Sequence, residues 1–158
     1  MTVLLRDAVE ADLPAILRFT RALAAHEGRP EAVSAGLDDL RSAGFGDPRR
    51  VWFLVAEAAG EPVGFAAWST PFSMYRGKGV LSVNTVFVEP AWQGRGLGRR
   101  IFAALAVRAL AEGLDRMEWS VLGTNRSAIA FYDRLGAGAP PVTSRRYLEG
   151  AALRALAA

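Results

Sequence analysis

The stretch "VFVEPAWQGRGLGRR", Val86–Arg100, places three glycines at alternate positions between an apolar run and a run with helical periodicity. Gly94, Gly96 and Gly98 each cost backbone entropy, and the start of a helix does not need three of them. A strand, a glycine loop and a helix form an anion-binding arrangement, because the first N–H groups of the helix point outward and its dipole adds partial positive charge. The stretch therefore predicts a diphosphate site; the alternative is an ordinary glycine-rich turn with solvated arginines.

Two familiar phosphate loops do not match this stretch. A P-loop needs Gly-Lys followed by Ser or Thr, whereas Gly98 is followed by Arg99 and Arg100. The dinucleotide fingerprint needs G-x-G-x-x-G near the first strand of a βαβ unit, but these glycines follow a G-x-G-x-G spacing late in the chain. Arg95, Arg99 and Arg100 add positive charge beside the loop, so an anionic ligand of another kind remains the prediction.

Length and composition indicate one domain, residues 1–158, with 51% hydrophobic and 22% charged residues. No apolar run approaches the roughly 20 residues of a membrane span. Asp7 and Glu10 come too early for a signal peptide, so we expect a cytoplasmic protein without a membrane partner. The chain has no cysteine, which excludes disulfides and thiolate chemistry, and we expect no metal site.

The net charge of +3 raises the question of nucleic acid. The arginines are scattered and acidic residues lie among them, so we expect no nucleic-acid partner. A mildly basic surface facing an anionic small molecule explains the charge equally well.

Periodicity predicts alternating strands and helices, and hence an α/β fold. Strands are expected at 3–8, 79–90, 115–123 and 141–150, with a hairpin over 51–70. Helices are expected at 10–28, 30–44, 94–113 and 126–135. Asp12 and Asn125 are the expected N-caps, and the helices are expected to end at Gly28, Gly44 and Gly136. The helix over 94–113 carries two neighbouring apolar stripes, which indicate packing against a sheet: Leu97, Ile101 and Leu105, and Phe102, Ala106 and Leu110.

At this point a family resemblance becomes visible. "QGRGLG", residues 93–98, resembles the Q/R-x-x-G-x-G/A signature of the GNAT acetyltransferases, and "NRSAIAFYDRLGA", Asn125–Ala137, is similar to their second hallmark. "FTRALAAHE", "DDLRSAGFG", "FLVAE" and "VGFAAW" resemble the diamine and polyamine branch, which includes spermidine/spermine enzymes. The resemblance implies the GNAT fold, a mixed and mostly antiparallel sheet of six or seven strands with helices on both faces. It also implies a homodimer.

The implied activity is direct transfer of an acetyl group from acetyl-CoA to a small primary amine. Acetyl-CoA is expected to enter where two central strands splay apart after Val88. In similar enzymes the strand before the loop bonds the pantetheine arm through its backbone, and the matching residues here are Val86, Phe87 and Val88. The loop amides implied to hold the pyrophosphate belong to Gly94, Arg95, Gly96, Leu97, Gly98 and Arg99.

The second hallmark carries the expected general acid. Asn125, Ile129 and Tyr132 share a helix face at i, i+4 and i+7. The resemblance implies that Tyr132 contacts the co-substrate and protonates the departing thiolate, since a phenol has an unperturbed pKa of about 10. Asn125 is implied to bond the co-substrate arm. The alternative is that Tyr132 only packs and Asn125 only caps its helix.

The acceptor amine must be neutral to attack a thioester, so a base is expected. His26 is the single histidine, with a titration range suited to a base, and Glu27 offers a charge for the amine. Both match acceptor-side positions in similar enzymes; the alternative for His26 is an ordinary helix-end residue. Asn84 and Thr85 stand where the polyamine enzymes carry a Glu-Asp pair.

The loop over 71–79 is expected on the acceptor side and carries two positive charges, Arg76 and Lys78. With Asn84 and Thr85 neutral, this loop disfavours a polycation. We expect instead a smaller amine bearing a carboxylate, which would meet Arg76 or Lys78. The alternative function is a non-catalytic acyl-CoA-binding domain of the same fold.

Overall fold

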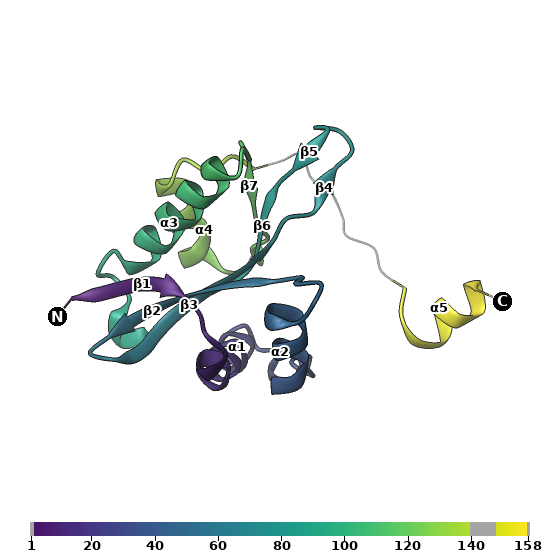
Figure 1. The fold of residues 1–158 in the computed structure, drawn as a ribbon, viewed down its shortest axis with the longest axis horizontal. Coiled ribbons are helices and arrows are strands. Elements are labelled where there is room, and N and C mark those ends of the chain that lie inside the picture. The colour runs from purple at the N-terminus through teal and green to yellow at the C-terminus, as the bar shows by residue number, and fades with distance from the viewer. Residues whose placement is uncertain (1, 140–147, 158) are drawn as a thin grey trace. The chain divides into compact units, whose positions relative to one another are not determined.

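Strands and helices alternate along residues 2–139 and 148–157, the part of the chain that the computed structural model describes (Figure 1). The strands are β1 (Val3–Asp7), β2 (Trp52–Ala58), β3 (Glu61–Ser69), β4 (Phe72–Ser73), β5 (Lys78–Gly79), β6 (Leu81–Val88) and β7 (Met117–Glu118). The helices are α1 (Leu13–His26), α2 (Leu37–Phe45), α3 (Leu97–Ala111), α4 (Arg126–Arg134) and α5 (Gly150–Leu156). The chain divides into two compact units, Met1–Asn125 and Arg126–Ala158.

The main sheet has five strands in the order β1-β2-β3-β6-β7. The first four pair antiparallel, and β6 pairs parallel to β7, so the sheet is mixed and mostly antiparallel as predicted. The strand number differs from the six or seven expected in one sheet, because β4 and β5 form a separate two-stranded sheet. The strand expected at 141–150 falls largely outside the described residues.

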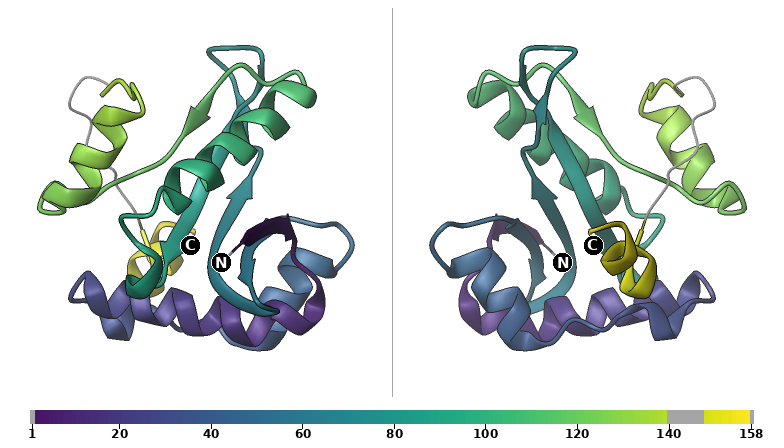
Figure 2. Two further views of the ribbon diagram at one scale, coloured as in Figure 1. Left: turned by 90° about the vertical axis from the view of Figure 1, so that its left-hand side faces the viewer. Right: turned by 90° about the vertical axis from the view of Figure 1, so that its right-hand side faces the viewer.

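Helices cover both faces of the main sheet, which confirms the α/β prediction. Figures 1 and 2 show α3 on one face and α1 and α2 on the other. Each face has its own hydrophobic cluster. The α3 face buries, among others, Leu97, Ile101 and Leu105 against Leu54, Ala66, Trp68 and Leu81. The α1 face buries Leu13, Ile16 and Phe19 against Phe53, Val55 and Phe65.

A β-bulge changes the alternation of β6. Ala67 faces Thr85 and Trp68 faces Val83, so Asn84 has no counterpart on β3. An extra residue shifts the two-residue period of a strand by one. The shift lets Leu81 and Val83 before the bulge pack on the same α3 face as Val86 and Val88 after it, while Phe87 packs on the α1 face.

The predicted hairpin is confirmed, with a two-residue turn between β2 and β3. Ala59 has φ +50° and Gly60 φ +84°, the left-handed pair that a tight hairpin needs. The helix predicted over 30–44 is instead a 3-10 turn, Pro30–Ala32, followed by α2. Gly44 does not end that helix. It lies inside α2, where a Cβ would come 2.2 Å from the ring of Phe53, so packing on β2 explains this glycine.

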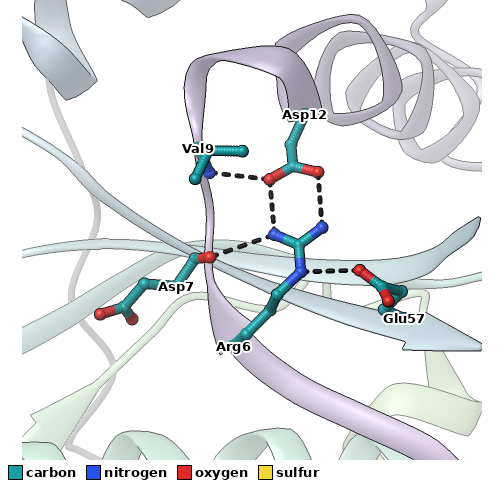
Figure 3. Close-up of polar contacts among 5 residues, drawn as sticks. All are labelled: Arg6, Asp7, Val9, Asp12 and Glu57. Carbon is teal, nitrogen blue, oxygen red and sulfur yellow. Dashed lines mark hydrogen bonds and ion pairs between the residues drawn. The ribbon is translucent and has the colours of Figure 1, made fainter. Parts of the chain in front are cut away.

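A partly buried ion cluster joins β1, β2 and the start of α1 (Figure 3). Arg6 donates to both carboxylate oxygens of Asp12, at 2.7 and 2.9 Å, and to Glu57 at 2.7 Å. Asp12 holds the predicted N-cap position, but its carboxylate makes no cap bond in α1 and accepts from the Val9 N–H at 2.8 Å. The hydrogen bonds from Arg6 hold the pKa of Asp12 below its usual value.

The second unit contains α4 and α5. Asn125 directly precedes α4, and Gly136 follows its last turn with φ +81°, both as predicted. The N–H of Ala137 donates to the carbonyl oxygen of Tyr132, which closes the helix end. Within the described residues, no helix is both long and apolar enough to cross a membrane.

Candidate functional site

Within residues 2–139 and 148–157, one edge of β6 has no neighbouring strand along most of its length. Its pairing with β7 comprises only Leu81 with Met117 and Ser82 with Glu118, and the strand expected over 115–123 is reduced to β7. In the described part of the chain no strand continues that pairing along Val83–Val88. The splaying of two central strands is therefore present, but it begins before Val88 rather than after it.

The backbone groups on this open edge can be assigned from the β3–β6 ladder. The N–H of Glu89 donates to the Val63 carbonyl at 3.0 Å, so Gly64 and Val88 form a non-hydrogen-bonded pair. The N–H and C=O of Val88 consequently point away from β3, and by alternation so do those of Val86. These two residues offer the strand backbone to a ligand.

Phe87 lies between them and faces the other way. The Cβ that Gly64 lacks would come 2.8 Å from the Phe87 carbonyl oxygen, which places that oxygen on the β3 side. The Phe87 ring stacks on Phe19 of α1 with centroids 5.4 Å apart. Phe87 was predicted to bond the pantetheine arm through its backbone, but its peptide groups belong to the ladder and its side chain to the core.

The glycine loop connects β6 to α3 and leaves free backbone donors. Gly94 and Gly96 have φ +71° and +77°, and an added Cβ at either would meet nothing within 4 Å. Space is therefore left beside the backbone on this side of the described chain. The first intrahelical bond of α3 runs from the Arg100 N–H to the Gly96 carbonyl at 3.1 Å, so the N–H groups of Leu97, Gly98 and Arg99 have no acceptor within the helix.

The three arginines of the loop have different partners. The Arg95 guanidinium lies over the Trp92 ring, 5.5 Å from its centroid. Arg100 donates to the Val3 carbonyl at 2.7 Å, so it ties α3 to β1; this acceptor is neutral, and the guanidinium keeps its positive charge beside the loop. Arg99 is exposed on the first turn of α3. Arg95 and Arg99 remain candidates for contact with an anion.

Of the three acceptor-side residues outside the loop over 71–79, His26 and Asn84 are exposed, and Glu27 is paired with Arg29. His26 is the exposed last residue of α1, and Asn84 is exposed at the bulge of β6. The Glu27 carboxylate accepts from Arg29 at 3.3 Å and keeps 22% side-chain exposure. An acceptor amine would therefore compete with Arg29 for Glu27.

Arg76 and Lys78 converge on one carboxylate. Both donate to Asp115, at 2.7 and 3.1 Å, and the hydrogen bond from Arg76 is the main cause that lowers the pKa of Asp115. Two cations and one carboxylate leave the cluster with a net charge of +1. The hairpin β4–β5 is thus anchored to the turn after α3, and its cations are shared rather than unpaired.

Tyr132 and Asn125 lie at or within the helix of the second hallmark. Tyr132 is half-buried in α4, where its ring contacts that of Phe131 with centroids 5.3 Å apart. Asn125 is half-buried, and its N–H donates to the Leu122 carbonyl at 2.8 Å. Their proposed roles stay predictions.

Two residues at the site received no role from the sequence, although one of them, Gln93, is the first residue of the "QGRGLG" stretch. Gln93 donates from Nε2 to the Val88 carbonyl at 2.9 Å. Gly64 approaches β6 so closely that a Cβ would lie 3.3 Å from the Cα of Val88. The position of Gln93 directly before the glycines was a usable signal, whereas Gly64 depends on the pairing of two strands.

Comparison with known proteins agrees with this geometry. The model of the acetyltransferase (GNAT) family matches residues 17–137. A thialysine N-epsilon-acetyltransferase from Bos taurus is 34% identical over 143 residues, which cover 85% of this chain and 84% of that protein. A spermidine/spermine N(1)-acetyltransferase-like protein 1 from Homo sapiens is 31% identical over 140 residues, which cover 84% of this chain but 20% of that protein.

The fold also matches solved structures. An integron cassette protein from the mobile metagenome of V. cholerae superposes with a TM-score of 0.79 at 23% identity, covering 99% of this chain and 98% of the other. At this identity the likeness concerns the fold, and it agrees with the sheet order and helix placement described above.

Proposed function

The chain belongs to the acetyltransferase (GNAT) family, and we propose that it transfers the acetyl group of acetyl-CoA directly to the amine of a small acceptor that also carries a carboxylate. The observation that carries the proposal is the continuity of the open β6 edge with the glycine loop. Together they present backbone donors and acceptors first for an amide-containing arm and then for a diphosphate. The family match extends across the boundary at residue 125 to residue 137, which supports one acetyltransferase domain.

Acetyl-CoA has the chemistry that this backbone would recognise. Its pantetheine arm carries two amides, which suit the outward N–H and C=O of Val86 and the N–H of Val88. Its pyrophosphate suits the free amides of Leu97, Gly98 and Arg99, with Gly94 and Gly96 leaving room beside the loop. A main-chain site of this kind explains Gly94 and Gly96 without a P-loop lysine.

The transfer itself balances as an attack of the neutral amine on the thioester carbonyl. The C–N bond forms, the C–S bond breaks, the amine loses one proton and the CoA thiolate gains one. We assign the protonation of the CoA thiolate to Tyr132, as the family resemblance implies. We assign the deprotonation of the amine to His26, directly or through water. The assignment of Tyr132 is testable by substitution, since removal of the acid should lower kcat and leave acetyl-CoA affinity intact.

The charges on the proposed acceptor side favour an amine that also carries a carboxylate. A polyamine gains affinity from carboxylates placed along its length, and this chain has Asn84 and Thr85 on β6 and a hairpin cluster of net charge +1. An amino acid or its analogue offers one amine for Glu27 and one carboxylate for Arg76 or Lys78. The bovine relative is named for thialysine, a lysine analogue, which supports this class.

The test is a steady-state assay of CoA release with spermine, a short diamine, lysine analogues and simple amino acids. We expect the highest kcat/KM with an amine that bears a carboxylate. A preference for spermine of tenfold or more would overturn the charge argument but leave the acetyltransferase assignment intact. Saturable acetyl-CoA binding without turnover on any amine would instead favour a non-catalytic acyl-CoA-binding domain.

A further inference from the structure

We propose that Gln93 is a positioning residue that fixes the glycine loop against β6. It would thereby hold the backbone groups for the pantetheine arm and those for the diphosphate of acetyl-CoA at a fixed spacing. This inference rests on the proposed function, because it assumes that strand and loop hold parts of one molecule. It assigns a task to a side chain that the chemistry itself does not use.

The contact that carries the inference is the 2.9 Å hydrogen bond from Gln93 Nε2 to the carbonyl oxygen of Val88. That oxygen is the last acceptor of β6, and it faces the open edge. Two backbone hydrogen bonds also form between these residues. The Trp92 N–H donates to the Glu89 carbonyl at 2.8 Å, and the Gln93 N–H donates to the Pro90 carbonyl at 3.2 Å. The segment from strand to glycine loop therefore forms a tight turn with one side-chain tie across it.

The tie separates two sets of backbone groups. On the strand side, Val86 keeps an N–H and a C=O and Val88 keeps an N–H, while the Val88 carbonyl is already used by Gln93. On the loop side, the free amides begin at Leu97. Because Gln93 spans the junction, its bond sets how far the strand groups lie from the loop groups.

A purely structural cap is the competing explanation. Gln93 is exposed, and water can satisfy an exposed carbonyl, so the bond contributes little to the stability of the whole fold. The glycines that follow have few steric restraints of their own. Without the tie, strand and loop would each keep their groups but lose a fixed spacing, and only a ligand that engages both would be affected.

This difference defines the experiment. Calorimetry would measure the affinity of wild type, Gln93→Leu, Gln93→Glu and Gln93→Arg for three ligands: acetyl-CoA, 3′-phosphoadenosine 5′-diphosphate, and acetyl-4′-phosphopantetheine. Leucine cannot donate, and a carboxylate at this position cannot donate either, whereas arginine can reach the carbonyl with an N–H. The melting temperature of each variant provides the control for folding, and Gln93→Glu serves if Gln93→Leu does not fold.

We expect Gln93→Leu and Gln93→Glu to bind acetyl-CoA roughly three- to tenfold more weakly, the effect of one lost hydrogen bond. Both fragments should bind within about twofold of wild type in the leucine variant, and Gln93→Arg should retain acetyl-CoA affinity. Unchanged acetyl-CoA affinity in the leucine variant, or an equal loss for the diphosphate fragment, would overturn the positioning role. Wild-type protein that fails to bind acetyl-CoA would remove the proposed function itself, and this inference with it.

Discussion

Removing the guanidinium of Arg6 is the sharpest test of the folded structure, because this one side chain pairs with two carboxylates, those of Asp12 and Glu57. In Arg6→Met, the Asp12 carboxylate loses both of its charged hydrogen bonds and Glu57 loses one. The Asp12 side chain is only 7% exposed, so its charge would be left in a poorly solvated place with the Val9 N–H as its remaining partner among the bonds described. Breaking a buried pair costs about 3–5 kcal/mol.

Solvent exposure reduces the expected loss of unfolding free energy in Arg6→Met. The Arg6 side chain is 29% exposed, and water can reach Asp12 once the guanidinium is gone, so we expect the lower end, about 3 kcal/mol. For a chain of this length that loss corresponds to a fall in melting temperature of roughly 6–12 °C. Arg41→Met is the matched control, because Arg41 is half-exposed and pairs with Asp38 and Glu10 on the surface. Its loss should stay below about 1 kcal/mol.

The same variant should change the acid dependence of stability. Arg6 lowers the folded-state pKa of Asp12, so this stabilisation is complete above the unfolded pKa of about 4 and is lost as the pH falls through the lowered value. The gap in unfolding free energy between wild type and Arg6→Met should therefore narrow between about pH 5 and pH 2.

Chemical denaturation at several pH values measures both effects. Adding Asp12→Asn to Arg6→Met should recover part of the loss, because the more deeply buried of the two carboxylate charges is then removed. An Arg6→Met variant as stable as the Arg41→Met control, with a gap independent of pH, would show that the cluster does not stabilise the fold as argued.

Three further substitutions and one mass measurement test the site. Gly96→Val should weaken acetyl-CoA binding by roughly tenfold or more in calorimetry, because Gly96 has φ +77° beside the free amides; Gly113→Val, at φ +73° after α3, carries the same backbone strain and should leave the affinity unchanged. Tyr132→Phe should lower kcat by about 10²-fold with acetyl-CoA affinity retained; wild-type turnover would assign Tyr132 a packing role. Gly64→Ala should weaken acetyl-CoA binding, because the new Cβ would lie 2.8 Å from the Phe87 carbonyl and push β6 aside; equal affinity would mean that the strand adapts freely. Light scattering should give the mass of a homodimer, and a monomer mass would remove that proposal.

The fold was largely predictable because its signals are local. The hairpin turn at Ala59 and Gly60 and the stripe of Leu97, Ile101 and Leu105 depend on neighbours within a few residues. The second stripe on α3 was less reliable: Phe102 is buried, but Leu110 is 70% exposed. Periodicity shows which side chains share a helix face, but not how far the packing partner extends along it.

The candidate site also has features that local sequence signals predicted and features that depend on tertiary packing. Glycines before a helix start are a local signal for an anion, and the loop backbone has the expected geometry. The ion pairs of Asp115 with Arg76 and Lys78 could not be predicted from the sequence, because they depend on how the hairpin β4–β5 folds onto the turn after α3. The orientation of Phe87 likewise followed only from the register of β6 on β3.

The open edge of β6 has a consequence for how the protein behaves when it is stored or overproduced. The residues along it read "VNTVFV", without a charge or a proline, which is the composition of segments that add to a neighbouring chain in aggregates. A bound molecule that occupies this edge would also shield it. If the proposed function holds, preparations lacking acetyl-CoA should therefore self-associate faster than preparations that contain it.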